Sequence, residues 1–413
     1  MKKILVIGYV WPEPNSSAAG SHMMSILRLF RKQNWQVEFA TPSQPTDHMI
    51  DLMAEGISSQ SIALNCASFD AYIAEYKPDT VLFDRFMMEE QFGWRVEKQC
   101  PSALKILDTE DLQCLRHARH QALKAGRDMS QEDLFSDLAR REIAAILRCD
   151  VSLIISSFEM ELLVNTFKVD ASLLHYLPFM VDLKRLPLKT TAFSERKHFI
   201  SVGNFRHQPN WDMVLQLQKI WPLIKQKLPD AECHVYGSYP PPKATALDNP
   251  KSGFLIKGWA ENIFTVMQQS RLCLAPIRFG AGIKGKLLDA MMMQTPSITT
   301  SVGSEGMHQQ EESWPGVIVD DLNDFVAAAV TLYNDEPAWL AVQHNTSALL
   351  KSRYDADVLG AGLIKKITAI ENDLVQHRLN NFTGAMLKHH SMMSTQYMSQ
   401  WIAAKNANLA DNG

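Results

Sequence analysis

The stretch APIRFGAGIKGKLLDAM, residues 275–291, holds the residue types best suited to binding an anionic ligand. Gly280 and Gly282 allow the backbone to come close to a ligand because they carry no side chain. A helix predicted to begin near Ile283 points its free amide groups at the same place. The pattern therefore predicts a strand, a glycine loop and a helix start that together surround an anion.

Lys284 and Lys286 fall in the first turn of this predicted helix. Cations at the N-terminal end of a helix interact unfavourably with the helix dipole, so the two lysines are not explained by helix stability. Neutralising the charge of a bound diphosphate would explain them. Asp289 lies one turn further on, where its carboxylate could accept hydrogen bonds from a ribose hydroxyl pair. A second glycine loop, containing Glu305, follows the next strand. Together these residues favour a diphosphate site over the alternative of a surface loop with solvated lysines.

A second group of polar residues follows two predicted strands in the first half of the chain. Asp84 and Arg85 end one strand, and Asp108, Glu110 and Asp111 follow another. Carboxylates at strand carboxyl ends could bind the hydroxyl groups of an acceptor, or one could act as a general base, with Asp108 as the catalytic candidate. The alternative is helix capping, which stays open for Asp108 and Glu110 and is favoured for Asp111. Arg85 could pair with these acids or meet an anionic acceptor.

The loop at residues 11–20, between the first strand and the first helix, is predicted to form a flexible lid between two domains. Ser17, Gly20 and Ser21 would present amides to an acceptor or to donor phosphates at a helix start. The alternative is a surface loop that ends in a serine cap. His22 is predicted to lie on the helix surface.

The elements that position these residues alternate between β-rich runs and amphipathic helices, which predicts parallel sheets covered by helices on both faces. Helices are expected at 132–147 and 209–224, among others. Strands are predicted at residues 2–8, 36–40, 80–84, 103–107, 151–156, 199–203, 232–237, 272–276 and 297–301.

The alternation stops at residues 177–195, which carry two prolines and no clear period. The fold class is therefore predicted as α/β, with two doubly wound Rossmann-like domains facing across a cleft and a C-terminal helical tail. The expected divisions are a first, acceptor-side domain at 1–180, a linker at 181–197, a second, donor-side domain at 198–370 and a tail at 371–413.

The composition narrows the class of function. The 413 residues carry a net charge of −4, so no global basic field recruits nucleic acid, and a local basic patch stays open. No apolar run approaches the ~20 residues that span a bilayer. The six cysteines are scattered without a Cys-x-x-Cys pair, which predicts reduced residues in a cytoplasmic protein.

The residues quoted above resemble a known family. PIRFGAGIKGKLLDAM and the following TTSVGSEGM resemble the donor-binding region of family-four-type retaining glycosyltransferases of the GT-B fold (glycosyl transferases group 1). KKILVIGYVWPEPNSSAAGSHM, SLIISSFEMELL, FISVGNFRHQPNWD and HVYGS resemble further family segments in the family's order. The resemblance covers about residues 1–370, and the donor-binding region is its most specific part.

The resemblance implies a nucleotide-sugar donor on the second domain and an acceptor on the first, with no catalytic metal, no other cofactor and no protein nucleophile. It implies that Lys284 and Lys286 act in catalysis and that the tail packs back on the first domain. The implied acceptor-binding residues are Ser17, Gly20, Ser21, Asp84, Arg85 and Glu110. The implied donor-binding residues are Gly203, Asn204, Arg206, Gly280, Ala281, Gly282, Lys284, Asp289 and Glu305.

The chain departs from the family pattern at several of these positions. Many members carry two glutamates seven residues apart, whereas this chain has Ala281 and Asp289 there. Asn204 and Pro209 stand where many members have Arg and Lys, so the two lysines of the glycine loop carry more of the phosphate charge. Two other functions remain open, a nucleotide-sugar epimerase and a catalytically degenerate partner subunit that binds donor or glycan.

The expected partners are a nucleotide sugar and a glycan, lipid-linked or protein acceptor, and not nucleic acid. The sequence does not indicate an oligomeric state. Peripheral membrane association, at the inner face of the membrane, is an alternative raised by an apolar stripe in the tail. Packing in the core is the favoured interpretation of that stripe. The stripe comprises Met392, Met393, Tyr397, Met398 and Trp401.

Overall fold

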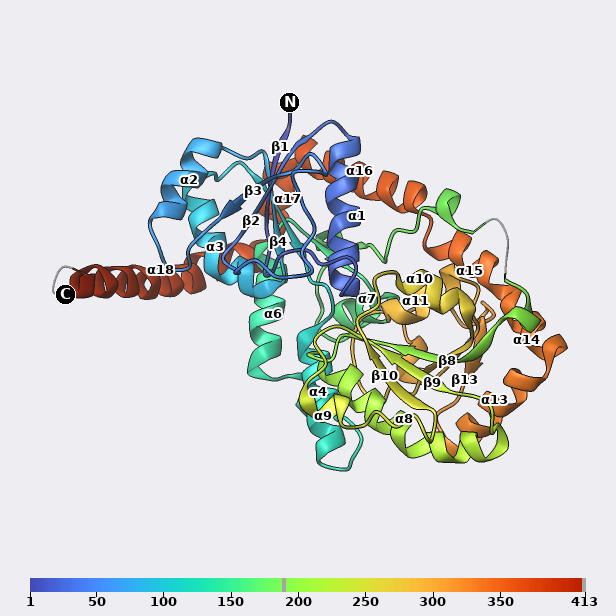
Figure 1. Cartoon of the computed structure of the whole chain (residues 1–413). Helices are drawn as coiled ribbons and strands as arrows, with labels where there is room; N and C mark the ends of the chain where they lie inside the picture. Colours follow the sequence, from blue (N-terminus) through green and yellow to red (C-terminus); the bar gives the residue numbers. More distant parts are fainter. Residues whose placement is uncertain (188–190, 411–413) are drawn as a thin grey trace.

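The computed structural model describes residues 1–187 and 191–410; the side chains of residues 390–392, Met392 among them, and of 406–410 lie outside that description. Two parallel sheets of seven and six strands form the centres of two α/β domains, which lie side by side in Figure 1. The predicted α/β class with two doubly wound domains is confirmed. Among the described helices, none combines the length and the apolar character that crossing a bilayer requires.

The first sheet has the strand order β3-β2-β1-β4-β5-β6-β7, so the order reverses between β1 and β4. Its strands are β1 (Lys3–Ile7), β2 (Gln36–Thr41), β3 (Ser58–Ser61), β4 (Thr80–Asp84), β5 (Leu104–Asp108), β6 (Val151–Ile154) and β7 (Leu174–Tyr176). Its helices are α1 (Ala18–Lys32), α2 (Ser68–Tyr76), α3 (Phe86–Gln99), α4 (Gln113–Lys124), α5 (Gln131–Leu134), α6 (Asp137–Arg148) and α7 (Ser157–Asn165). Short 3-10 turns follow at η1 (Ala171–Leu173), η2 (Leu183–Arg185) and η3 (Phe193–Glu195).

The second sheet has the order β10-β9-β8-β11-β12-β13 and reverses between β8 and β11. Its strands are β8 (Lys197–Val202), β9 (Cys233–Tyr236), β10 (Phe254–Gly258), β11 (Ser270–Ala275), β12 (Ser297–Thr299) and β13 (Gly316–Ile318). Its helices are α8 (Gln208–Lys227), α9 (Pro242–Thr245), α10 (Ile263–Gln269), α11 (Gly285–Met292), α12 (Ser301–Ser304), α13 (Leu322–Asn334), α14 (Glu336–Gln343) and α15 (Asn345–Arg353).

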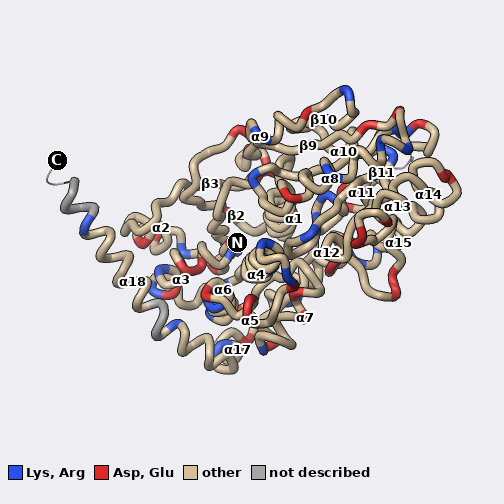
Figure 2. Tube along the Cα trace, turned by 90° about the horizontal axis from the view of Figure 1, so that it is seen from below, with Lys and Arg blue, Asp and Glu red and all other residues tan. Residues whose placement is uncertain are grey.

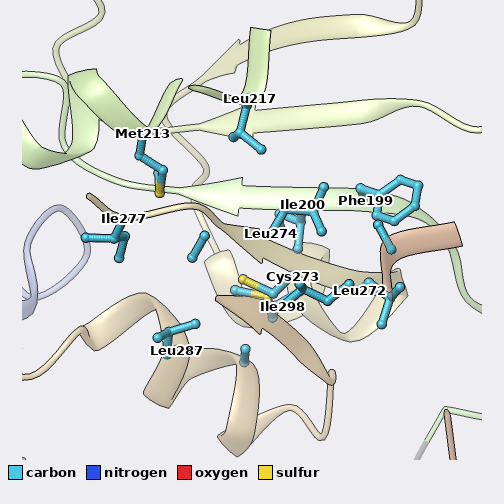
Figure 3. Close-up of a cluster of buried hydrophobic side chains, with 14 of the residues drawn as sticks. Phe199, Ile200, Met213, Leu217, Leu272, Cys273, Leu274, Ile277, Leu287 and Ile298 are labelled. Atoms are coloured by element: carbon cyan, nitrogen blue, oxygen red, sulfur yellow. The ribbon is translucent and has the colours of Figure 1, made fainter. Parts of the chain in front are cut away.

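All nine predicted strands are confirmed, and the four that the prediction missed are β3, β7, β10 and β13. These four are the edge strands of the two sheets. Central parallel strands are buried on both faces and show as apolar runs, whereas edge strands such as Ser58–Ser61 are partly exposed and carry no such run. Figure 3 shows the central pattern in the second domain, where Phe199, Ile200 and Leu274 pack against α8 and α11.

The prediction of a single helix at 132–147 is wrong. The segment forms two helices, α5 and α6, and the chain turns at Phe135 between them. Ser136 caps α6, because its side chain accepts a hydrogen bond from the amide of Ala139 at 3.3 Å. A serine at this position starts a new helix, since its hydroxyl satisfies an amide that has no partner within the helix.

The chain crosses between the domains twice at adjacent points. Val181 leaves the first domain and forms a parallel bridge with Asp355, which returns from the second. The amide of Val181 donates to the carbonyl of Tyr354 at 2.7 Å, and the amide of Ala356 donates to the carbonyl of Val181 at 3.0 Å. The two crossing segments therefore brace one another.

Helix α16 (Ala356–Asn372) lies within the range predicted for the second domain, yet it packs in the first. Its buried side chains Leu363, Ile367 and Ile370 join the core cluster that contains Met23 and Leu27 of α1. The return to the first domain thus occurs at residue 355 rather than at 371.

Helices α17 (Leu374–Asn380) and α18 (Phe382–Ala410) continue along the first domain, and α18 then extends beyond it in Figure 1. The guanidinium of Arg378 donates two hydrogen bonds of 2.8 Å to Asp150. Arg95 of α3 donates to the hydroxyl of Ser399 at 3.1 Å, and Lys388 pairs with Glu97 at 3.6 Å. The tail is therefore attached to α3 and to the neighbourhood of α6.

We expect Ile367→Ala to reduce the free energy of unfolding by about 2–4 kcal/mol, because it leaves a cavity in the core of the first domain. Val358→Ala on the exposed face of the same helix is the control and should change little. Hydrogen–deuterium exchange locates the effect: the amides of β1 should exchange faster while those of β8 stay protected. Faster exchange confined to β8 and its neighbours would show that α16 stabilises the second domain instead.

Candidate functional site

The glycine loop after β11 leads into helix α11, which begins at Gly285 rather than near Ile283. Lys284 is therefore the N-cap residue of the helix, and Lys286 lies in its first turn. Gly282 has a φ of +61°, and a Cβ at this position would lie 2.9 Å from the Cβ of Asp111 in the first domain. Only glycine combines that backbone conformation with so close an approach.

Two helix N-termini meet at this loop. Gly285 begins α11 and Ala18 begins α1, and a Cβ on Gly285 would collide with the side chain of Ala18. Both helices direct their free amides and the positive ends of their dipoles toward the region where they meet. Such an arrangement favours an anion bound between the domains.

Lys284 is 8% exposed and turns inward, and its Nζ donates to the carbonyl of Gly282 at 2.8 Å. Nζ of Lys286 donates to Oδ1 of Asn210 at 2.8 Å. Burial lowers the pKa of each lysine to about 8, and burial raises the pKa of Asp289 to about 7. An anion bound here would raise both lysine pKa values again and so favour the charged form of each lysine.

A second cluster lies at the carboxyl ends of β4 and β5 and consists of Asp84, Arg85, Asp108 and Glu110, together with His22 of α1. We call it the acid cluster. Oδ2 of Asp84 accepts from the amide of Tyr9 at 2.9 Å, which ties it to the end of β1. Nε2 of His22 lies 3.8 Å from Oδ1 of Asp108.

Several polar atoms of the acid cluster are buried but have no hydrogen-bond partner in the described part of the chain. Both ring nitrogens of His22, Oδ1 of Asp84 and Oδ2 of Asp108 are buried without a hydrogen-bond partner among the described residues. Burial raises the pKa of Asp108 and of Glu110, and burial lowers the pKa of His22. Buried polar groups normally have partners, so this cluster is suited to a hydroxyl-bearing ligand.

Two residues of the acid cluster have strained backbones. Arg85 has φ +69° and ψ 155°, a region that glycine occupies almost alone, and Glu110 has φ +57°. The amide of Arg85 donates to the carbonyl of Asp108 at 2.7 Å, which helps to hold the conformation. Strain of this kind costs about 1–3 kcal/mol for each residue and concentrates at functional sites.

The prediction that Asp111 caps the following helix is wrong, and neither Asp108 nor Glu110 caps it. Leu112 occupies the N-cap position, and Asp111 pairs with Arg116 instead. The free amides of Gln113 and Cys114 donate to the carboxylate of Glu142 at 3.0 and 2.9 Å. A glutamate from α6 therefore caps α4, which leaves the acids after β5 available for another role.

The expectation that His22 lies on the helix surface is also wrong. His22 is 1% exposed and faces Phe179, with ring centroids 5.4 Å apart. Its position five residues after the N-cap Ser17 turns it toward the sheet edge rather than toward solvent.

Direct contacts join the two domains across the site. Glu159 of α7 accepts a hydrogen bond from the amide of Gly282 at 2.7 Å. Arg119 of α4 donates to the carboxylate of Glu305 in two hydrogen bonds of 2.7 Å and to the carbonyl of Gly280 at 2.9 Å. The structure thus shows the two facing edges in a closed arrangement.

Sequence reasoning assigned no role to Arg119 or Glu159. Arg119 stands in the segment LRHAR and Glu159 in SFEMELL, and neither segment has a pattern that points to another domain. Only the docking of the domains brings these side chains to the glycine loop.

The loop at 11–20 also touches the second domain. The indole nitrogen of Trp259 donates to the carbonyl of Asn15 at 2.9 Å, and the hydroxyl of Tyr239 donates to Glu13 at 2.9 Å. The hydroxyls of Ser16 and Ser238 are 2.8 Å apart. This segment therefore lies between the domains, where the lid was predicted.

The three predicted residues at the end of this loop have structural contacts. Ser17 caps α1, accepting from the amide of Gly20 at 3.0 Å, so the loop ends at Ser17. A Cβ on Gly20 would lie 2.5 Å from the backbone of Glu13, and the hydroxyl of Ser21 donates to the carbonyl of Pro14 at 2.8 Å. These contacts hold the loop against the helix.

The remaining predicted donor residues lie at the end of β8. A Cβ on Gly203 would meet the side chain of Asn210, which also accepts from Lys286. Oδ1 of Asn204 accepts from the amide of Arg206 at 2.9 Å. The guanidinium of Arg206 is exposed and stacks 3.6 Å from the ring centre of Tyr239, beside the interdomain loop rather than beside the lysines.

Among the described residues, one group has the types and spacing to hold a metal ion, and it lies far from this site at the opposite ends of β8 and β9. It consists of His198, Glu232 and His234. Nδ1 of His198 accepts from the amide of Glu232 at 3.2 Å, and Nε2 of His234 lies 2.7 Å from the Glu232 carboxylate. In the neutral ring Nε2 of His198 therefore carries the proton, and the group satisfies its own hydrogen bonds without an ion.

The two-domain arrangement is the GT-B fold, and solved structures match it over most of the chain. Sucrose-phosphate synthase from Thermosynechococcus elongatus gives a TM-score of 0.66 at 14% identity, covering 90% of this chain and 99% of its own. An S. aureus TarM variant in complex with fondaparinux, alpha-GlcNAc-glycerol and UDP gives a TM-score of 0.67 at 9% identity, and the match covers 89% of this chain and 99% of the TarM chain. Anabaena Alr3699/HepE in complex with UDP and glucose gives 0.64 at 11% identity, covering 89% and 100%.

Residues 196–335 match the family model described as Glycosyl transferases group 1. The match contains the glycine loop and both of its lysines. No curated protein matches the chain. The resemblance to group 1 glycosyltransferases of the GT-B fold is confirmed, and the family match together with the fold supports sugar transfer.

We expect Asp108→Asn to stabilise the protein, and to do so more strongly at pH 8 than at pH 5. The folded-state pKa of Asp108 is raised to about 7, so the carboxyl costs stability progressively as the pH rises from its unfolded-state pKa of about 4 to about 7. The stabilisation measured by urea unfolding should be about 2–3 kcal/mol larger at pH 8 than at pH 5. His22, Asp84, Arg85 and Glu110 face this group, and the variant leaves them in place.

The exposed Asp128→Asn is the control for this measurement and should give the same change at both pH values. A stability difference between Asp108→Asn and the parent that does not depend on pH would contradict a buried, protonated Asp108.

Proposed function

We propose that this chain is a retaining glycosyltransferase of the hexosyltransferase type, which transfers a sugar from a nucleoside-diphosphate sugar to a hydroxyl group of a glycan, lipid-linked or protein acceptor. The observation that carries the proposal is the position of Lys284 and Lys286 where the N-termini of α1 and α11 meet. In the reaction, the bond between the anomeric carbon and the phosphate oxygen breaks, the acceptor oxygen bonds to that carbon, and the hydroxyl proton is released.

The second domain would bind the donor. The diphosphate gains negative charge as it leaves, and fixed cations and amides that meet this charge lower the barrier. Lys284, Lys286 and the free amides of the two helices supply them without a metal ion or another cofactor. Asp289 and Glu305 would accept hydrogen bonds from hydroxyl groups of the donor, although Glu305 must first exchange its contact with Arg119.

The first domain would bind the acceptor through the acid cluster. Its unpartnered carboxylate oxygens at Asp84 and Asp108 can accept hydrogen bonds from acceptor hydroxyls. With a pKa of about 7, Asp108 is ionised in a large share of the molecules at neutral pH, and the ionised carboxylate can take up the hydroxyl proton as the bond forms. Retention and the absence of a protein nucleophile rest on the family resemblance.

Access to the site would require the domains to separate. Glu159 accepts from the amide of Gly282, and Arg119 holds Glu305, so both interactions lie where the donor would bind. Val181 and Asp355 lie at the two crossing points and form the natural hinge. Opening and closing around this hinge would admit the donor and then exclude water.

The proposed location is the cytoplasm. All six cysteines are free thiols, and five of them are buried, as expected for a protein in a reducing compartment.

Lys284→Met should reduce turnover by about a hundredfold or more, because it removes a cation that stabilises the leaving diphosphate. UDP-glucose and UDP-GlcNAc are the first donors to test, since the similar TarM and HepE structures contain UDP. Slow hydrolysis of the donor, measured without acceptor, gives a readout before the acceptor is known. The exposed Lys251→Met in the same domain is the matched control and should leave hydrolysis unchanged.

Thermal-shift screening across a panel of nucleotide sugars provides the independent test, since a bound donor raises the melting temperature. If no nucleotide sugar binds at millimolar concentration, the proposal is wrong. Binding without turnover would identify a non-catalytic partner subunit, and conversion of the donor into an isomer would identify an epimerase.

A further inference from the structure

Helix α18 carries an apolar stripe that no described part of the chain covers. The exposed stripe differs from the one predicted from the sequence: Met393, Tyr397 and Trp401 belong to both, and Phe382 and Met386 complete the exposed one. The five residues of the exposed stripe are spaced by four, seven, four and four residues along the chain. This spacing places them on one face of a helix. Their exposed fractions run from 43% at Met393 to 71% at Phe382.

The favoured expectation that the apolar residues of the tail pack in the core is therefore wrong for those that the structure describes. Met398 is also 58% exposed, and α17 adds Val375 and Leu379 at 75% and 66%. The opposite face of α18 provides the attachment to the first domain, through Lys388 and Ser399. The stripe thus points away from the protein, and Figure 1 shows α18 projecting past the first domain.

The charge of this segment differs from that of the rest of the chain. Residues 374–410 contain no Asp or Glu, whereas the overall composition would place about four acids in a segment of this length. Arg378, Lys388 and Lys405 give the segment a formal charge of +3, of which Arg378 and Lys388 are paired with Asp150 and Glu97 of the first domain. Figure 2 shows Lys and Arg along α18 and no acidic residue on it.

The composition of the stripe fits a lipid surface. Trp and Tyr place an apolar ring beside a polar group, which suits the boundary between acyl chains and headgroups. The ammonium of the exposed Lys405 lies 5.4 Å from the ring centre of Trp401, so a cation stands beside the largest apolar side chain. Arg140 and Arg141 of α6 line a hollow whose wall includes Leu387 of α18, but they pair with Asp137 and Glu90, so Lys405 is the cation that the described part of the chain leaves beside the stripe.

We propose that α18 lies in the surface of an anionic lipid bilayer through its exposed apolar stripe and attaches the first domain to that bilayer. The stripe would enter the headgroup region, and Lys405 would meet lipid phosphates. A second copy of the chain is less well matched to this face, because its own α18 has no acidic residue that could pair with Lys405. The proposal does not depend on the chemistry of the interdomain site.

Vesicle co-sedimentation with the full-length protein tests this proposal. We expect the protein to sediment with vesicles of phosphatidylcholine mixed with phosphatidylglycerol, and much less with phosphatidylcholine alone. Added salt should weaken the binding, because the electrostatic contribution is screened. Lys405→Ala should lower the partition constant about fivefold, the effect expected of one lysine at an anionic surface.

The triple variant Met393→Glu, Tyr397→Glu, Trp401→Glu should lose binding, by at least about tenfold. The control is Leu322→Glu, Leu340→Glu, Val358→Glu, which makes the same charge change at exposed apolar positions of helices α13, α14 and α16. It should keep most of the binding. Circular dichroism confirms that both variants fold, and the donor thermal shift should be the same in both, which separates this test from that of the proposed function.

Two results would overturn the proposal. One is equal sedimentation of the parent and the stripe variant. The other is a parent protein that does not bind vesicles and elutes as a dimer, while the stripe variant elutes as a monomer, since the stripe would then be an interface between two copies of this chain.

Discussion

The burial of positive groups between the domains is the constraint on which the rest of this structure depends. Two helix N-termini and two lysines converge between the domains, and the lysines reach only neutral oxygens. Burial lowers the pKa of both lysines, which measures the electrostatic cost of this arrangement. The domains meet this positive region with carboxylates: Glu159 accepts from the glycine loop, and Glu305 accepts from Arg119. A diphosphate placed there would compensate the buried positive charge, so the features that destabilise the closed protein are those that favour the donor.

The acid cluster, in the first domain, also lowers the stability of the protein, through backbone strain and unsatisfied buried atoms. Arg85 and Glu110 are held in strained conformations, and Asp84, Asp108 and His22 are buried with unsatisfied atoms. A protein selected only for stability would place glycine at the strained positions and apolar residues at the buried ones. These destabilising features lie at the carboxyl ends of β4 and β5, next to the point where the strand order reverses. Open α/β sheets bind their ligands at such a point.

The connection between the domains links these two regions mechanically. The chain crosses at Val181 and returns at Asp355, and the crossing segments pair with one another. After the return, α16 packs in the core of the first domain, so the second domain is bounded by two adjacent crossings rather than by one linker. Such a hinge permits rotation about one axis while it keeps both sheet edges facing each other. Helix α18, attached to α3, fixes the orientation of its exposed stripe relative to the first domain.

The sequence by itself determined the class of fold, all central strands and the glycine loop. The central strands are buried on both faces, so they stand out as continuous apolar runs. Glycines followed by lysines at the start of a helix have few roles other than binding an anion. The four edge strands escaped prediction, since they are partly exposed and lack that signal. Tertiary structure alone decided that His22 faces the acid cluster, that Glu142 rather than Asp111 caps α4, and that Arg119 and Glu159 reach the other domain. Each of these depends on a contact between residues distant in the chain, and no local pattern encodes which distant group will arrive.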